Sequence, residues 1–269
     1  FIMPALYAHN KFGKLVIPKL PSTIKETVRK YPNEFRMGLQ GPDFLFFYLT
    51  RKDITKIGVT MHHSDVYPFM EHASEIVQEL GINSPEYSYI LGFICHFALD
   101  NACHPYVNRF MKGTGCGHVE IEGDLEHLLI TKDSFNPESY PIYKLVPATY
   151  KVAIAMDSLY NYVSLEDIYH SLHMMKKVKK IFVAPNCLKR SLLDLSMHAT
   201  FHYKQLKGHV IFPNANMQCR RESEILCNIL YNSVDDAVNL INDFTISTLS
   251  GSILPTEFHR DFNGNHFSF

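Results

Sequence analysis

Three side chains that can bind a metal ion recur at intervals of four residues in the later part of the first half of the chain. They are His96, Asp100 and His104, in the sequence His-Phe-Ala-Leu-Asp-Asn-Ala-Cys-His. Four residues along an α-helix advance about 40° around its axis, so a helix here would place all three on one slanted stripe. Apolar neighbours such as Phe97 flank the stripe, and a buried carboxylate must be paired or metal-bound because an unpaired buried charge is very costly. The spacing therefore predicts a metal site.

A second pair of candidate ligands follows on the next predicted helix. His118 and Glu122 are four residues apart in His-Val-Glu-Ile-Glu, so adjacent helical turns let them bind one ion together. Any single histidine is more often an ordinary core or surface residue. Five ligand-type residues at these spacings on consecutive helices instead favour a shared centre, and zinc is the ion that such nitrogen and oxygen ligands suit.

The order and spacing of these ligands resemble the zinc-dependent phospholipase C family, which shares its helical fold with the fungal single-strand nucleases. Three upstream segments are similar to further ligand elements of that family, and two late segments are similar more weakly. The upstream segments are Met3-Pro-Ala-Leu-Tyr-Ala-His9, Gly41-Pro42-Asp43 and His62-His63, and the late ones are Phe212-Pro213 and Phe262-Asn-Gly264.

The resemblance implies a cluster of two or three zinc ions. The implied ligand sets are Asp43, His62 or His63, His96 and Asp100 for one ion; His104, His118 and Glu122 for a second; and His9, Asp100 and the N-terminal amine and carbonyl for a third. Asp100 would bridge two ions. The chain departs from secreted relatives in having no Trp to supply the terminal amine. Adjacent helical residues point about 100° apart, so only one of His62 and His63 is expected to face the cluster.

The leading hypothesis for function is a zinc-dependent hydrolase of phosphate esters, phospholipase C-like by this resemblance. Paired zinc ions lower the pKa of a bridging water and stabilise the charge on the attacking and leaving oxygens. Asp43 is a candidate to orient or deprotonate the water, with a purely structural ligand role as the alternative, and a phospholipid is a candidate substrate. One alternative is a nuclease or a small-molecule phosphodiesterase or phosphatase on the same cluster. Another is a non-enzymatic protein stabilised by coordinatively closed metal ions.

Bases of a nucleic acid would need aromatic platforms beside the metals. The candidates are Tyr48, Tyr67, Phe69 and Tyr106, and core packing is the better interpretation of each. Four acidic or histidine side chains near the ligands in sequence either hydrogen-bond to ligands or face solvent. They are Asp65, Asp124, Glu126 and His127.

The elements that must position these residues are predicted to be helices, within one all-α domain over residues 3–269. Ser84-Pro85-Glu86 is a strong helix start, and Pro105 predicts a kink or an end just after His104. The apolar run 44–48 fits either a strand or a buried helix. The other predicted helices cover 21–31, 66–80, 118–130, 146–163, 165–181, 186–206 and 222–249, with a loop over 113–117.

The composition limits the classes of partner. The 269 residues carry a formal net charge of -1, so no global field attracts nucleic acid or an anionic membrane, and no stable nucleic acid partner is expected. The basic stretch 176–180 could contact anionic lipid, although a solvated helix face is the better interpretation. The sequence leaves the oligomeric state open.

The six cysteines contain no C-x-x-C pair, which predicts reduced, mostly buried thiols and a cytoplasmic location. The first residues do not resemble a signal peptide, and no apolar run is long enough to span a membrane. Met3-Pro4 resembles a natural start, so residues 1–2 are interpreted as an added remnant.

Overall fold

The fold is built from α-helices and short 3-10 helices. The computed structural model describes residues 5–199 and 203–267, and within those ranges the β pairing is limited to an isolated bridge between Arg260 and His266. The all-α prediction is confirmed. The α-helices are α1 (Leu6–Val16), α2 (Ser22–Lys30), α3 (Pro32–Gly38), α4 (Lys52–His63), α5 (Tyr67–Leu80), α6 (Pro85–Thr114), α7 (His118–Lys132), α8 (Tyr150–Asp157), α9 (Leu165–Phe182), α10 (Cys187–Ala199), α11 (Tyr203–Leu206), α12 (Arg220–Asn232) and α13 (Val234–Ser250); the 3-10 helices are η1 (Ile17–Lys19), η2 (Gly41–Phe47), η3 (Ile142–Leu145), η4 (Lys207–His209) and η5 (Thr256–Phe258).

The long helix α6 is the central element of the fold. Its start is as predicted: the Ser84 side chain accepts a hydrogen bond from the Tyr87 backbone N–H, and Pro85 is the first helical residue. Of the two outcomes predicted at Pro105, an end of the helix is wrong, because α6 continues to Thr114 and ends at Gly115 in the left-handed conformation. Proline removes only one backbone donor, and buried residues on both sides of it, Cys103 and Val107, keep this part of the helix packed.

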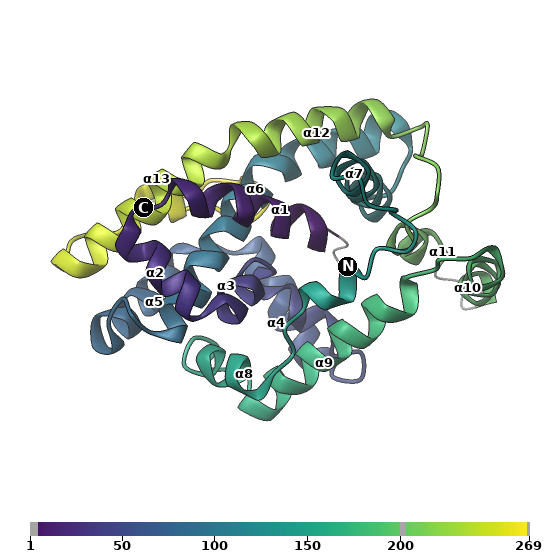
Figure 1. The fold of residues 1–269 in the computed structure, drawn as a ribbon. Helices are drawn as coiled ribbons and strands as arrows, with labels where there is room; N and C mark the ends of the chain where they lie inside the picture. Colours follow the sequence, from purple (N-terminus) through teal and green to yellow (C-terminus); the bar gives the residue numbers. More distant parts are fainter. Residues whose placement is uncertain (1–4, 200–202, 268–269) are drawn as a thin grey trace.

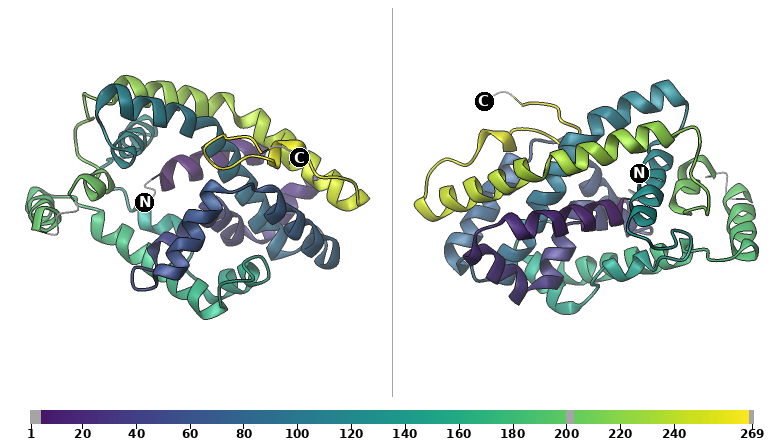
Figure 2. Two further views of the ribbon diagram at one scale, coloured as in Figure 1. Left: turned by 180° about the vertical axis from the view of Figure 1, so that it is seen from behind. Right: turned by 45° about the horizontal axis from the view of Figure 1, so that its top comes forward.

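Helices from both ends of the chain surround α6. It contacts α1 and α3 from the N-terminal part, α7 that follows it, and α12 and α13 from the C-terminal part. Figure 1 shows α12 and α13 along one side of the molecule and α8 and α9 along the opposite side, and Figure 2 shows the same arrangement from two further directions. The candidate ligands on α1, α6 and α7 therefore lie on helices that pack directly against one another.

Two glycines bring the segment before Asp43 close to α6. A Cβ atom on Gly38 of α3 would lie 2.0 Å from the carbonyl oxygen of Tyr89, and one on Gly92 of α6 would lie 2.1 Å from the carbonyl oxygen of Phe35. Neither position has room for a side chain, because backbone atoms cannot give way. This close approach positions η2, which begins three residues after Gly38, beside the helix that carries His96.

Several boundaries differ from the predictions. The run 44–48, left open between strand and helix, lies mostly in the buried η2, and α1 and α4 were not predicted. The predicted helix 222–249 is two helices that meet at Ser233, and 146–163 contains only the shorter α8. The predicted helix 186–206 contains α10 and α11, with residues 200–202 outside the described ranges.

One large apolar core includes side chains from α1 through to Phe262. The single domain over residues 3–269 stays a prediction. Within the described ranges, every helix is too short or too polar to cross a lipid bilayer.

Candidate metal centre

Eight predicted ligands converge in three groups. Within each group the nitrogen and oxygen atoms that could bind an ion lie within 4.8 Å of one another. The groups are His9, His96 and Asp100; Asp43, His62 and His96; and His104, His118 and Glu122. They come from α1, η2, α4, α6 and α7, and all are buried except His118, whose side chain is 13% exposed.

The stripe predicted on α6 forms the centre of the cluster. His96 Nε2 lies 3.2 Å from Asp100 Oδ2, and His104 Nε2 lies 3.6 Å from Asp100 Oδ1. His9, from α1, places its Nε2 3.2 Å from the same Oδ1 atom. Asp100 thus lies between imidazoles of two different groups, which is where a carboxylate can serve two ions.

The segment Gly41-Pro42-Asp43 supplies a second carboxylate from the start of η2. Asp43 Oδ1 lies 2.9 Å from His62 Nε2 and 3.9 Å from His96 Nε2. The third group lies toward α7, where Glu122 Oε1 is 3.4 Å from His104 Nε2 and 3.0 Å from His118 Nε2. His96 therefore links the first two groups, and His104, a member of the third group, lies 3.6 Å from Asp100.

Three of the histidines are oriented by backbone carbonyls. The Nδ1 atom of His62 lies 2.8 Å from the Gly58 oxygen, that of His104 lies 2.8 Å from the Phe262 oxygen, and that of His96 lies 3.3 Å from the Leu39 oxygen. A nitrogen that donates to a carbonyl carries the proton, so Nε2 of the neutral ring presents a lone pair. In the neutral rings each Nε2 lone pair then faces a carboxylate oxygen, which is also an acceptor; at His104 a proton on Nε2 separates the two until an ion replaces it. A cation between them resolves this conflict.

The buried polar atoms of the cluster fit a bound metal. Five of them have no hydrogen-bond partner among the described residues, although buried polar atoms are nearly always satisfied. They are His9 Nδ1, His96 Nε2, Asp100 Oδ2, His104 Nε2 and Glu122 Oε2. Imidazole nitrogens with carboxylate oxygens are the donor set of zinc.

Burial and neighbouring charges shift the pKa values in the cluster. Burial lowers the pKa of His96 to about 4, which keeps it in the neutral, metal-binding form at neutral pH. Burial acts the same way on His104, but Asp100 and Glu122 outweigh it and raise that pKa to about 9. Burial also opposes ionisation of Glu122, yet His118 and His104 lower its pKa to about 2. His104 is thus the ligand that must release a proton when an ion binds.

The absence of a side chain at Gly41 leaves room for the His96 ring. The φ of Gly41, +48°, is in the left-handed region, and a Cβ atom there would lie 2.2 Å from His96 Cδ2. We expect Gly41→Ala to displace His96 and remove at least one zinc ion per chain, as measured by elemental analysis. Gly81→Ala is the matched control: its φ is +84° but a Cβ atom there would have no neighbour within 4 Å. The control should lose roughly 1–3 kcal/mol of stability and keep its zinc; equal zinc content in both variants would contradict this role of Gly41.

The structure separates the two adjacent histidines of α4. His62 is buried in the cluster, whereas His63 is exposed and lies outside all three groups, with its Nδ1 atom 3.3 Å from Asn263 Nδ2. The expectation that only one of them faces the cluster rests on helix geometry, and the structure selects His62. The N-terminal amine and carbonyl proposed for the third ion, and residues 1–4 with them, lie outside the described residues.

Three of the four polar residues that lie near the ligands in sequence contact partners outside the three ligand groups. Asp65 lies 2.9 Å from His259 Nδ1, Asp124 accepts a hydrogen bond from Ser223, and the His127 Nε2 atom lies 3.1 Å from the Pro213 carbonyl oxygen. The fourth, Glu126, continues the interval of four from His118 and Glu122 along α7. Its buried carboxylate accepts a hydrogen bond from the Tyr7 backbone N–H, at the start of the helix that carries His9.

Two residues of the second half that sequence reasoning did not connect with the site are buried near it. Burial lowers the pKa of Lys179, and the charges of Glu126, Asp43 and Glu122 act on it in the opposite direction. Burial also lowers the pKa of His209, the charge of Lys179 adds to this effect, and the charge of Glu122 opposes it. In the sequence, Lys179 is one residue of the basic stretch 176–180. Nothing in the local sequence distinguishes one buried lysine from its exposed neighbours Lys177 and Lys180.

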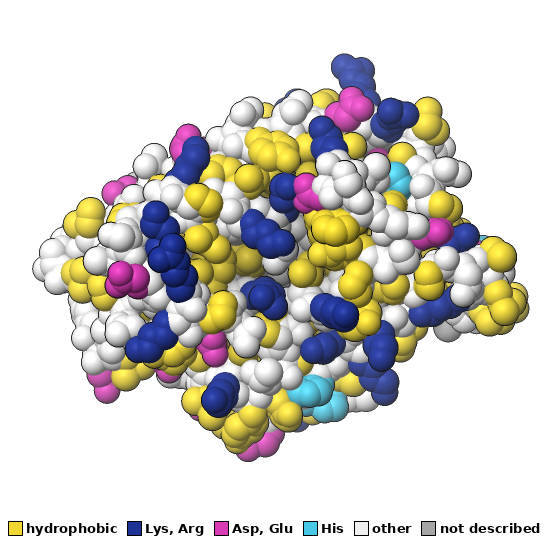
Figure 3. Space-filling view, viewed as in Figure 1, with side chains coloured by type: hydrophobic (Ala, Val, Ile, Leu, Met, Phe, Trp, Pro, Cys, Tyr) yellow, Lys and Arg dark blue, Asp and Glu magenta, His cyan; other side chains and the backbone are white. Residues whose placement is uncertain are grey.

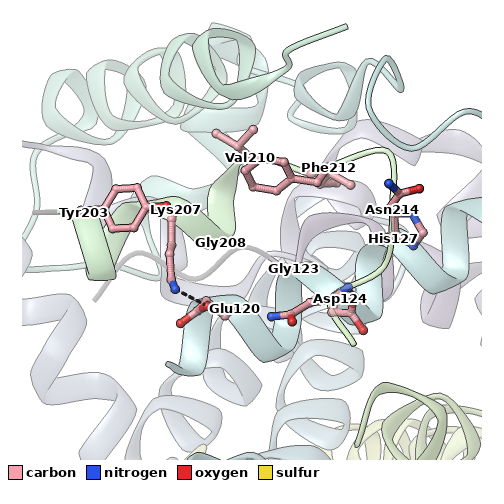
Figure 4. Close-up of a pocket in the computed structure, with 12 residues that line it drawn as sticks. Glu120, Gly123, Asp124, His127, Tyr203, Lys207, Gly208, Val210, Phe212 and Asn214 are labelled. Carbon is pink, nitrogen blue, oxygen red and sulfur yellow. Dashed lines mark hydrogen bonds and ion pairs between the residues drawn. The ribbon is translucent and has the colours of Figure 1, made fainter. Parts of the chain in front are cut away.

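A surface pocket lies beside α7 but shares no residue with the three groups. It has a volume of about 250 Å³ and lies between α7 and the segment 203–216. Figure 4 shows its lining, with the Lys207 ammonium 2.6 Å from Glu120 Oε1. Its floor is narrow because a Cβ atom on Gly123 would lie 2.4 Å from the Gly208 carbonyl oxygen. The pocket is therefore separate from the candidate metal centre.

Comparison with known proteins identifies the family. A family model described as "Zinc dependent phospholipase C" matches residues 8–177, which is more than half of the chain. All eight clustered ligands lie within this range. The searches of curated proteins and of solved structures gave no match. The helical fold and the converging His, Asp and Glu side chains agree with the family match. The chain belongs to the zinc-dependent phospholipase C family.

Proposed function

We propose that the chain is a phospholipase C-like hydrolase of phosphate esters that holds two or three zinc ions in the three ligand groups. The observation that carries this proposal is the connection between the groups. His96 belongs to two of them, and Asp100 lies 3.6 Å from His104 of the third. Shared ligands keep neighbouring ions together, which is the arrangement of two-metal sites that hydrolyse phosphate esters.

Bound zinc ions would lower the pKa of a bridging water and stabilise charge on the phosphate oxygens. The chain's own residues then have separate tasks. Asp100 contacts imidazoles on both sides and is suited to hold two ions. Asp43 comes from η2 rather than from the α6 stripe. We propose that it orients the attacking water and accepts the proton of that water. The carbonyls of Leu39, Gly58 and Phe262 fix the imidazole orientation.

A phospholipid headgroup is the proposed substrate class, from the name of the family. Figure 3 shows Lys and Arg side chains spread among apolar ones over the face seen in Figure 1, and the exposed Lys177 and Lys180 belong to α9. Such a mixed basic and apolar surface suits contact with lipid. The cytoplasmic location expected from the sequence stays a prediction.

The aromatic side chains considered as base platforms support a nuclease less well. Tyr67 stacks on His259 with ring centroids 4.0 Å apart, and Phe69 stacks on Phe93 at 4.4 Å. Tyr48 contacts the His170 ring at 4.5 Å. Tyr106, the fourth candidate, is exposed, with its ring centroid 6.3 Å from that of Phe110. The other three rings already have partners within the protein, so the four are not arranged as a row of free stacking surfaces.

We expect Asp43→Asn to lower the rate of hydrolysis roughly 100-fold or more while most zinc remains bound, because loss of a general base commonly costs this much. Zinc content and initial rate are measured on the same preparation. Asp65→Asn is the control, since Asp65 contacts His259 outside the cluster. Parent-level rates in the Asp43 variant would remove Asp43 from the reaction.

A substrate screen tests the proposed function. The zinc-loaded chain is incubated with phosphatidylcholine or phosphatidylserine vesicles, single-stranded DNA, bis-p-nitrophenyl phosphate and p-nitrophenyl phosphate. The proposal predicts release of diacylglycerol from the vesicles. Cleavage of DNA or of the small esters alone would instead favour the nuclease or small-molecule alternatives. A zinc-loaded chain inactive on every substrate would favour a metal-stabilised, non-enzymatic protein.

A further inference from the structure

Two cysteines that are distant in sequence meet in a buried position at one edge of α7. The Sγ atoms of Cys116 and Cys219 lie 2.7 Å apart, although 103 residues separate them along the chain. Cys116 is 4% exposed and Cys219 is fully buried. Two sulfur atoms that only pack against each other stand farther apart than this, because non-bonded atoms repel at such separations. The contact therefore indicates a pair that can react with each other.

Independent contacts hold both cysteines in place. Cys116 lies in the short connection between α6 and α7, where its backbone N–H donates to Thr114 Oγ1 at 3.1 Å. Cys219 is the residue before the first turn of α12. Asp124 of α7 accepts hydrogen bonds from the Asn216 backbone N–H at 2.6 Å and from Ser223 Oγ at 2.7 Å. These bonds anchor the segment around Cys219 to α7 without any help from sulfur.

The polar surroundings favour a bond between the sulfurs over a metal site. Asn216 Nδ2 lies 3.9 Å from Cys116 Sγ and 3.4 Å from Cys219 Sγ, and Gln218 Oε1 lies 3.8 Å from Cys116 Sγ. Amide groups are weak metal ligands beside thiolates. Among the described residues, no group of three metal-binding side chains includes either cysteine.

We propose that Cys116 and Cys219, which are free thiols in this structure, form a disulfide bond that joins the connection before α7 to the start of α12. For this pair the proposal replaces the expectation of reduced thiols drawn from the sequence. A glutathione-type disulfide is the oxidant. Cys116, the more exposed of the two, attacks one sulfur of the oxidant as its thiolate, forms a mixed disulfide and releases one glutathione thiolate. The Cys219 thiolate then attacks the Cys116 sulfur and releases the second. Two protein thiols lose two electrons to the oxidant, and their two protons end on the two glutathione thiols.

The bond would close a long loop and act close to the candidate metal centre. Cross-links that close loops of about 100 residues restrict the unfolded chain strongly. For a chain of this size we expect the oxidised protein to melt roughly 10 °C above the reduced one. Helix α7 begins at His118, two residues after Cys116. The same bond would therefore fix the start of the helix that presents His118 and Glu122.

The test combines peptide mapping with melting curves. The full chain is unfolded, refolded with zinc and a mixture of reduced and oxidised glutathione, alkylated and digested without reductant. A second sample of the folded chain receives oxidised glutathione without unfolding. Mass spectrometry is expected to find the peptides of Cys116 and Cys219 joined in at least the refolded sample. The melting temperature of that sample should fall when a reductant is added.

Two variants separate this pair from the other cysteines. The double variant Cys116→Ser, Cys219→Ser should melt at the same temperature with and without reductant. Cys227→Ser, which changes another buried cysteine of α12, should keep the full difference. Recovery of both cysteines as alkylated thiols in both samples would overturn the proposal. Their recovery joined to glutathione or to other cysteines would do the same.

Discussion

Asp100→Asn is expected to lower zinc content and hydrolysis together, with the loss of at least one ion per chain and roughly a 1,000-fold lower rate. The substitution removes a full negative charge from the position between His9, His96 and His104, where cations would otherwise repel each other. A 1,000-fold loss corresponds to about 4 kcal/mol of transition-state stabilisation, which is the scale expected of metal assistance. Zinc content by elemental analysis and initial rates on a phosphodiester measure both effects.

Asp124→Asn is the matched control for this variant. Asp124 is also a buried carboxylate, but it holds Ser223 and the backbone of Asn216 and lies outside the three ligand groups. This control should lose stability while it retains zinc and activity. If Asp100→Asn retained every ion and hydrolysed the substrate at the parent rate, the assignment of Asp100 as a bridging ligand would be wrong.

Removal of zinc by a chelator is expected to lower the melting temperature by roughly 10 °C or more and to abolish hydrolysis. The ligands come from five elements, and the charges and lone pairs they bury together need a cation to offset them. An ion present at 1,000 times its dissociation constant stabilises the folded state by about 4 kcal/mol, which corresponds to this shift for a chain of this length. Calorimetry before and after dialysis against the chelator measures the effect.

Addition of zinc back to the chelated sample is the control. It should restore both the melting temperature and the rate, which excludes irreversible damage by the chelator. An unchanged melting curve after verified removal of the metal would place the ions outside the core of the fold.

The part of the site on α6 and α7 could be predicted because the information is local. Intervals of four residues fix His96, Asp100 and His104 on one helical stripe, and the same rule pairs His118 with Glu122. The start of α6 at Ser84-Pro85 was predictable for the same reason, since capping depends on the adjacent residues. Family resemblance, rather than spacing, supplied His9, Asp43 and the pair His62-His63.

The parts that could not be predicted depend on contacts between distant segments. The choice of His62 over His63 requires the orientation of α4 relative to η2. Continuation of α6 past Pro105 depends on packing that outweighs the local preference of proline. The approach of Cys116 to Cys219 depends on how α12 packs along α7, and no local motif marks either cysteine as half of a pair.

The most direct test of the metal centre is a crystal structure of the zinc-loaded chain with anomalous scattering measured at the zinc edge. We predict two or three zinc peaks, each roughly 2.0–2.2 Å from its nitrogen and oxygen ligands. The peaks should lie among the Nε2 atoms of His62, His96 and His104 and the carboxylates of Asp43, Asp100 and Glu122. Zinc-replete crystals with no peak among these side chains, or with peaks only elsewhere, would contradict this prediction.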